Sequence, residues 1–83
     1  MSLAKFLREC TLTAVNGRCS SIAAYTLFCE WQVFHRRRVP QPQTFAQAML
    51  RRGFRLVREE NGREVFLGLC ILPEFRTYRA SGG

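Results

Sequence analysis

Arginine dominates the residues of this chain that could do chemistry, since twelve of its thirteen basic residues are arginine. The guanidinium group carries a rigid fork of donors that matches phosphate oxygens and the edge of guanine. Ten arginines fall within residues 35–83, where only four glutamates oppose them, and this half holds most of the net charge of +7. The uneven charge predicts a polyanionic partner for the second half, rather than a surface that is basic only for solubility.

Polar residues at helical spacing follow a proline-containing connector. A face without bulky apolar side chains is formed at positions i, i+3, i+4 and i+7 by Thr44, Gln47, Ala48 and Arg51. Glutamine pairs with adenine, arginine pairs with guanine, and a small alanine allows close approach to a thymine methyl group. Gln43 and Arg52 lie at the two ends of this segment and are placed to contact phosphates of the DNA backbone. The pattern predicts a helix that reads base edges in the major groove of double-stranded DNA, with an ordinary solvated helix face as the alternative.

Two further groups of arginines flank this segment. They are Arg36, Arg37 and Arg38 before it, and Arg55, Arg58 and Arg63 after it. The first group is predicted to clamp phosphates, with a solvated charge run as the alternative, and the second group to grip phosphates or to enter a minor groove. Glu59, Glu60 and Glu64 weaken the interpretation of the second group, and a protein-contact surface stays open there. If about five of these arginines meet phosphates, log affinity falls with log salt at a slope of about −4 to −5.

Catalytic and metal-binding patterns have little support in this sequence. His35 is the only histidine, and neither a carboxylate pair in a plausible pocket nor a glycine-rich phosphate loop is present. The cysteines at positions 10, 19, 29 and 70 lack the short spacing of a structural zinc site, so we expect small, reduced, packing residues. We therefore expect no enzymatic activity, no cofactor and no metal ion.

Three helices are predicted to position the arginines. The spacing of apolar residues places them over residues 3–10, 21–35 and about 43 or 44 to 52. The second is capped by Ser20 or Ser21, and its apolar residues lie nearly all round, so we expect a scaffold helix buried on several sides. Gly53 stands where the third helix should end. Between the first two helices, Asn16-Gly17 indicates a turn and a short extended stretch around residues 18–19.

The clearest local signal is Asn61-Gly62 between two β-prone runs, which predicts a hairpin with a two-residue type I′ turn. That turn pairs Glu60 with Arg63. The same register places four apolar residues on the core face, namely Phe54, Leu56, Leu67 and Leu69. It places Phe66 on the opposite face, beside Val57.

This order of elements predicts an α+β fold, a winged helix-turn-helix with three helices and a C-terminal β-hairpin wing. One domain is expected over residues 1–75, followed by a basic flexible tail over residues 76–83. In such a fold the short helix before the hairpin enters the major groove, and the hairpin contacts the flanking backbone. No signal peptide or bilayer-spanning apolar run is found, so we expect a cytoplasmic protein, nucleoid-associated if bacterial, with no membrane partner.

Several motifs together suggest a family. They are Ser21, Tyr25, Phe28 and Trp31; then Pro42, Phe45, Met49, Gly53 and Phe54; then Gly62-Arg63 and Gly68-Leu69. Because of these motifs, residues 21–72 resemble the C-terminal DNA-binding domain of primase-helicase proteins. Such proteins occur in phages, satellite phages, plasmids and large DNA viruses such as poxviruses. The resemblance implies a winged helix that recognises a replication origin. It also implies helicase and primase domains upstream in the same polypeptide, because this chain lacks a Walker motif.

Two other functions remain open at this stage. A stand-alone winged-helix transcriptional regulator would use the same fold and the same DNA-facing residues. A winged-helix protein-interaction module is the third possibility, since one fold supports many functions. The sequence leaves the oligomeric state, the DNA site and the host open.

Overall fold

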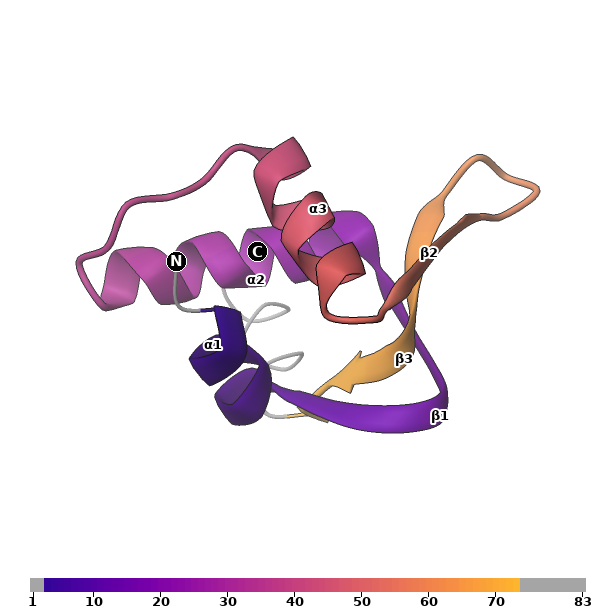
Figure 1. Cartoon of the computed structure of the whole chain (residues 1–83), viewed down its shortest axis with the longest axis horizontal. Coiled ribbons are helices and arrows are strands. Elements are labelled where there is room, and N and C mark those ends of the chain that lie inside the picture. Colours follow the sequence, from indigo (N-terminus) through magenta and orange to yellow (C-terminus); the bar gives the residue numbers. More distant parts are fainter. Residues whose placement is uncertain (1–2, 74–83) are drawn as a thin grey trace.

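The computed structural model of the chain describes residues 3–73 and contains three helices and a three-stranded antiparallel sheet (Figure 1). In chain order, the elements are α1 (Leu3–Cys10), β1 (Thr11–Ser20), α2 (Ser21–Phe34), α3 (Pro42–Arg51), β2 (Arg55–Arg58) and β3 (Glu64–Ile71). The three predicted helices and the C-terminal hairpin are confirmed. This small α+β architecture is compatible with a winged helix. The tail expected over residues 76–83 lies outside the described residues.

The first strand is much longer than the short extended stretch predicted around residues 18–19. β1 pairs with the central strand β3 over two stretches, first Thr11 to Thr13 and then Arg18 to Ser20, and residues 14–17 form a bulge between them. Gly17 lies in this bulge directly against the neighbouring strand, because a Cβ atom there would come within 2.8 Å of the Leu69 carbonyl carbon and oxygen. Gly17 therefore lets two strands approach, and the turn predicted at Asn16-Gly17 is a bulge within β1 instead.

The register predicted for the hairpin is wrong by one residue. Arg58 pairs with Glu64, and the N–H of Glu59 donates to the carbonyl oxygen of Arg63 at 2.7 Å. The loop therefore spans residues 60–62, and Gly62 adopts a φ of +85°. A type I′ turn also needs a positive φ at Asn61. Instead, the Asn61 side-chain oxygen accepts a hydrogen bond from the backbone N–H of Arg63 at 2.9 Å, which favours the longer loop.

The shifted register changes one position on the core face, whereas Phe54 and Leu56 pack against the core and Leu69 is buried within it, as predicted. Phe66, predicted on the outer face, is 1% exposed and pairs with Leu56, whereas Leu67 is only half-buried. Gly68 follows with a φ of +101° and interrupts the alternation, so Leu69 returns to the core. Burying one large phenylalanine ring decides the register, because a slip by one residue moves a whole strand face between core and solvent.

Capping residues explain where the helices begin and end. The Ser20 side chain accepts a hydrogen bond from the N–H of Ala23 at the start of α2. Pro42 opens α3, one or two residues earlier than predicted, because its missing N–H is harmless in a first turn. Gly53 ends α3 with a φ of +97°, and its N–H donates to the carbonyl oxygen of Leu50.

A chain of aromatic rings joins the three helices and β3 into one core. The Phe28 ring on α2 lies 5.0 Å from Phe6 on α1 and 5.1 Å from Phe45 on α3, and Phe45 lies 6.1 Å from Phe66 on β3. Ring pairs at these distances add stability beyond their buried area. α2 packs against α3 and the sheet and contacts Phe6 of α1, as expected of a scaffold helix. It is not buried all round, because Ile22, Val33 and Phe34 are exposed.

Candidate nucleic-acid interface

The exposed face of α3 carries most of the polar residues predicted to read DNA. Phe45 and Met49 turn into the core, and the opposite surface is exposed at Gln43, Thr44, Gln47, Arg51 and Arg52. Ala48 differs from them, because it is half-buried and packs against the core cluster. Ala48 therefore lies at the margin of this surface. In Figure 1, α3 crosses in front of α2.

The connector that carries Arg36, Arg37 and Arg38 is held against α2 through its backbone. Tyr25 donates from its hydroxyl group to the carbonyl oxygen of Pro40 at 2.7 Å, and the buried Gln32 donates from Nε2 to that of Arg38 at 2.8 Å. The three arginine side chains are exposed. A rigid backbone with exposed cations suits contact with a polyanion, because little conformational entropy is lost on binding.

Arg36 occupies a backbone conformation that normally favours glycine. Its φ is +56°, and its N–H donates to the carbonyl oxygen of Val33 at 2.9 Å, while the N–H of Arg37 donates to that of Gln32 at 2.8 Å. These two bonds form the standard end of a helix, in which the left-handed residue is most often glycine. Arginine here is strained by an amount on the order of 1 kcal/mol, and such strain points to a use for the side chain.

Two of the three acidic residues of the hairpin form ion pairs with arginines of the same chain. Arg58 lies 3.4 Å from Glu64 across the strands, and Arg18 on β1 lies 2.7 Å from Glu59. Glu60 stays exposed at the tip and forms no ion pair with another described residue. The sequence did not reveal Arg18 as part of this region, because its position depends on the bulge in β1. The hairpin is therefore less acidic toward solvent than its composition indicates.

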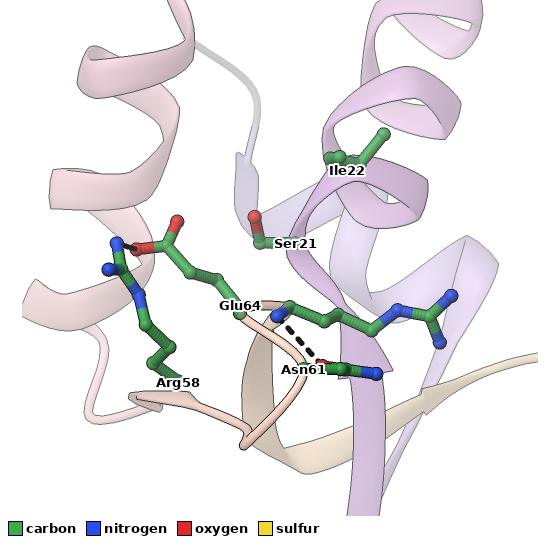
Figure 2. A pocket seen from close by; sticks show the side chains of 7 residues that line it. Ser21, Ile22, Arg58, Asn61 and Glu64 are labelled. Atoms are coloured by element: carbon green, nitrogen blue, oxygen red, sulfur yellow. Dashed lines mark hydrogen bonds and ion pairs between the residues drawn. The ribbon is translucent and has the colours of Figure 1, made fainter.

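A hollow of about 510 Å³ lies between the hairpin tip and the first turn of α2. The hollow is lined by Ser21, Ile22, Arg58, Asn61, Gly62, Arg63 and Glu64. Figure 2 shows Arg58 turned toward Glu64, with Ser21 and Ile22 on the opposite wall. The cleft is open to solvent and brings charged hairpin residues beside the N-terminus of a helix.

Six of the predicted DNA-binding arginines make no ion pair with any residue between 3 and 73. They are Arg36, Arg38, Arg51, Arg52, Arg55 and Arg63, and all are exposed. The connector and the hairpin lie toward opposite ends of a molecule with a longest extent of 35 Å, and α3 stands between them (Figure 1). This arrangement spreads unsatisfied positive charge on both sides of a polar helix face.

Other kinds of site find no counterpart in the described part of the chain. No three histidine, cysteine or acidic residues among residues 3–73 are grouped so that they could hold a metal ion. None of the four cysteines, all of which lie within the described residues, is joined in a disulfide bond. Within the same range, the helices are too short and too polar to cross a bilayer.

Comparison with known proteins identified no relative: no family model, no curated protein and no solved structure matches this chain. The resemblance to primase-helicase domains therefore depends on its sequence motifs alone. Among those motif positions, Phe28, Trp31 and Phe45 are buried, and Gly53 and Gly62 adopt positive φ. These positions serve packing and turns, so the motifs describe a fold more directly than a function.

Proposed function

We propose that this chain is a winged-helix domain that binds double-stranded DNA, with α3 in the major groove. The observation that carries the proposal is the set of six exposed arginines without ion pairs around the polar face of α3. A guanidinium group without a protein partner is available to a phosphate, and each contact releases counterions from the DNA.

The dimensions support this docking. A helix of ten residues is about 15 Å long, and its polar face fits a major groove about 12 Å wide. The longest extent of the molecule, 35 Å, is greater than the width of that groove. The connector and the hairpin therefore extend past the edges of the groove that α3 enters, where they can contact the bordering phosphates.

Roles follow from position. Thr44, Gln47 and Arg51 face outward along α3 and are assigned to base edges, where Gln and Arg make bidentate contacts. Phosphate contacts are assigned to the remaining predicted residues, namely Arg36, Arg37, Arg38, Gln43, Arg52, Arg55 and Arg63. Arg58 contributes less than these, because its guanidinium group already lies against Glu64. Ala48 contributes only by being small.

The resemblance to primase-helicase domains supports a narrower proposal, in which the bound DNA is a replication origin and helicase and primase domains precede this one in the same polypeptide. A stand-alone transcriptional regulator is the alternative with the same DNA-binding surface. The sequence of the complete gene separates the two, because a helicase-primase carries phosphate-binding motifs upstream. A protein-interaction role for the hairpin is less favoured, since Glu59 and Glu64 are engaged by arginines of the same chain.

The test is a salt-dependent binding titration with random-sequence duplex and with single-stranded DNA of equal length. Binding to duplex is expected at about 50 mM salt, with a log–log slope of about −4 to −5 as salt increases. Single-stranded DNA should bind more weakly, because it offers α3 no groove. Absence of duplex binding at about 50 mM salt would rule out both DNA-binding functions.

A further inference from the structure

The face of α2 opposite the core carries an apolar stripe that no described residue covers. Ile22, Thr26, Cys29 and Val33 follow one another at intervals of four, three and four residues. Ile22 is 75% exposed and Val33 is 63% exposed, whereas Thr26 and Cys29 are half-buried. This spacing is that of a coiled-coil seam, along which two helices pack side by side.

The stripe has a protrusion at one end and a hollow at the other. Ile22 stands exposed in the first turn of α2. Near the last turn, a shallow, largely apolar hollow of about 400 Å³ that is wide open to solvent is lined by Cys29, Glu30, Val33 and Phe34. The Phe34 ring beside this hollow is 82% exposed. An aliphatic side chain on a second helix fits such a hollow as a knob fits a hole.

We infer that a second copy of this chain covers the stripe, with the two α2 helices antiparallel. The intervals of four, three and four residues are the same in both directions, so an antiparallel copy matches every position. Ile22 of each copy then faces Val33 of the other and enters its hollow, and Thr26 faces Cys29. The two contacts are related by a two-fold axis, which is the commonest symmetry of protein dimers.

The charges on α2 favour a second copy at this surface. The helix contains no lysine or arginine, and Glu30 is its only charged residue, although the chain carries a net charge of +7. Two copies that meet along α2 therefore bring no cationic side chains of the two helices together. In the antiparallel arrangement, Glu30 of one copy lies beside Ala23 of the other, in the first turn of that helix. A carboxylate is stabilised there by the positive end of the helix dipole.

The exposed area predicts the strength of this association. Ile22, Val33 and Phe34 together offer on the order of 400 Å² of apolar surface per copy, compared with about 800 Å² per partner in a stable interface. The dimer is therefore weak and concentration-dependent. It does not rest on DNA binding, but neighbouring DNA sites would raise its effective concentration, and two copies would then bind cooperatively.

Disulfide trapping in the full chain tests the antiparallel register. The double variant Ile22→Cys/Val33→Cys, in a Cys29→Ser background, should form a covalent dimer under mild oxidation, seen by mass spectrometry without reductant. The two sites are eleven residues apart on one helix, about 16 Å, so they cannot link within a chain. Each single variant should link far less, because antiparallel packing keeps identical positions apart. Absence of the dimer, or equal linking by a single variant, overturns the inference.

Sedimentation equilibrium without DNA tests the association itself. The weight-average mass should rise with concentration for the unmodified chain and stay monomeric for Ile22→Glu. Val15→Glu is the matched control, since Val15 is 99% exposed on the bulge of β1, away from α2, and should associate normally. Circular dichroism verifies that both variants fold. A monomer at every concentration, or equal loss in both variants, overturns the inference, whether or not the chain binds DNA.

Discussion

The two arginine-rich regions differ in how their charges are satisfied. Around α3 and its connector, exposed arginines such as Arg36, Arg38 and Arg51 make no ion pair with residues 3–73. In the hairpin, Arg58 faces Glu64, and Glu59 is bound by Arg18 from another strand. The number of arginines in a segment therefore does not give the positive charge available to a ligand. The pairing of arginines with glutamates across the strands determines how much of that charge remains free.

Both arginine-rich regions are held in place by the same core. Phe45→Ala should therefore have the largest effect on stability and disturb the positions of both regions. The ring contacts Tyr25, Phe28 and Phe66, and its loss leaves a cavity that lowers the free energy of unfolding by about 3–5 kcal/mol. Urea denaturation followed by circular dichroism measures this change. Phe34→Ala is the control, because that exposed ring should change stability by less than about 0.5 kcal/mol. Equal effects would mean that Phe45 does not organise the core.

The connector and α3 can be separated by their effects on DNA binding. Replacing Arg36, Arg37 and Arg38 together with alanine should weaken binding to all duplexes alike and flatten the salt slope by about 2 to 3. Arg51→Ala should instead reduce the preference among sequences, by about 1–3 kcal/mol at the base pair it reads. Titrations against random and selected duplexes distinguish the two. If both variants behave alike, α3 does not read bases.

Gly17→Ala should damage the hairpin side more than the α3 side. A methyl group there would collide with the Leu69 backbone, shift β1, and displace Arg18 from Glu59. We expect a loss of about 1–3 kcal/mol in the free energy of unfolding, and hydrogen exchange should accelerate in β1 and β3 before α3. Val15→Ala, in the same bulge but fully exposed, should be nearly neutral. An unchanged stability of the Gly17 variant would contradict the packing described for β1.

Arg36→Gly should stabilise the chain while weakening its binding to DNA. Glycine adopts a φ of +56° without strain, so the free energy of unfolding should rise by up to about 1 kcal/mol. The loss of one cation should lower affinity for every duplex and flatten the salt slope by about 1. Thermal unfolding and the salt titration measure the two effects. Arg38→Gly serves as the control, because it removes a charge where φ is not positive. A gain in stability without loss of affinity would remove Arg36 from the interface.

Removing the glutamate that pairs with Arg58 should have the smallest effect. The hairpin would then carry a free arginine, as the connector does. In Glu64→Gln the exposed ion pair is lost, with a change in stability of about 0–1 kcal/mol. The freed guanidinium group should steepen the salt slope of duplex binding by up to about 1. Glu60→Gln removes an acid that holds no arginine, so its slope should stay unchanged. Identical slopes for both variants would show that Arg58 does not reach the DNA.

Much of the local structure was predictable because short-range signals decide it. Helix periodicity located α1, α2 and α3, Ser20 and Gly53 marked helix ends, and Asn61-Gly62 marked the hairpin. The exposure of the predicted arginines also followed from their positions in these elements. The register of the hairpin was not predictable in this way, because the burial of Phe66 outweighs the preference of the turn.

The helices, the hairpin and the concentration of arginine in the second half could be recognised from local sequence, since each depends on residues close together in the chain. Tertiary structure alone decided which arginines stay free, because the ion pair of Arg18 with Glu59 joins segments 41 residues apart. It also decided that one side of α2 is exposed, since periodicity does not show how many neighbours a helix has. Packing between distant segments determines both the free arginines and the exposed side of α2, and local sequence preferences do not encode this packing.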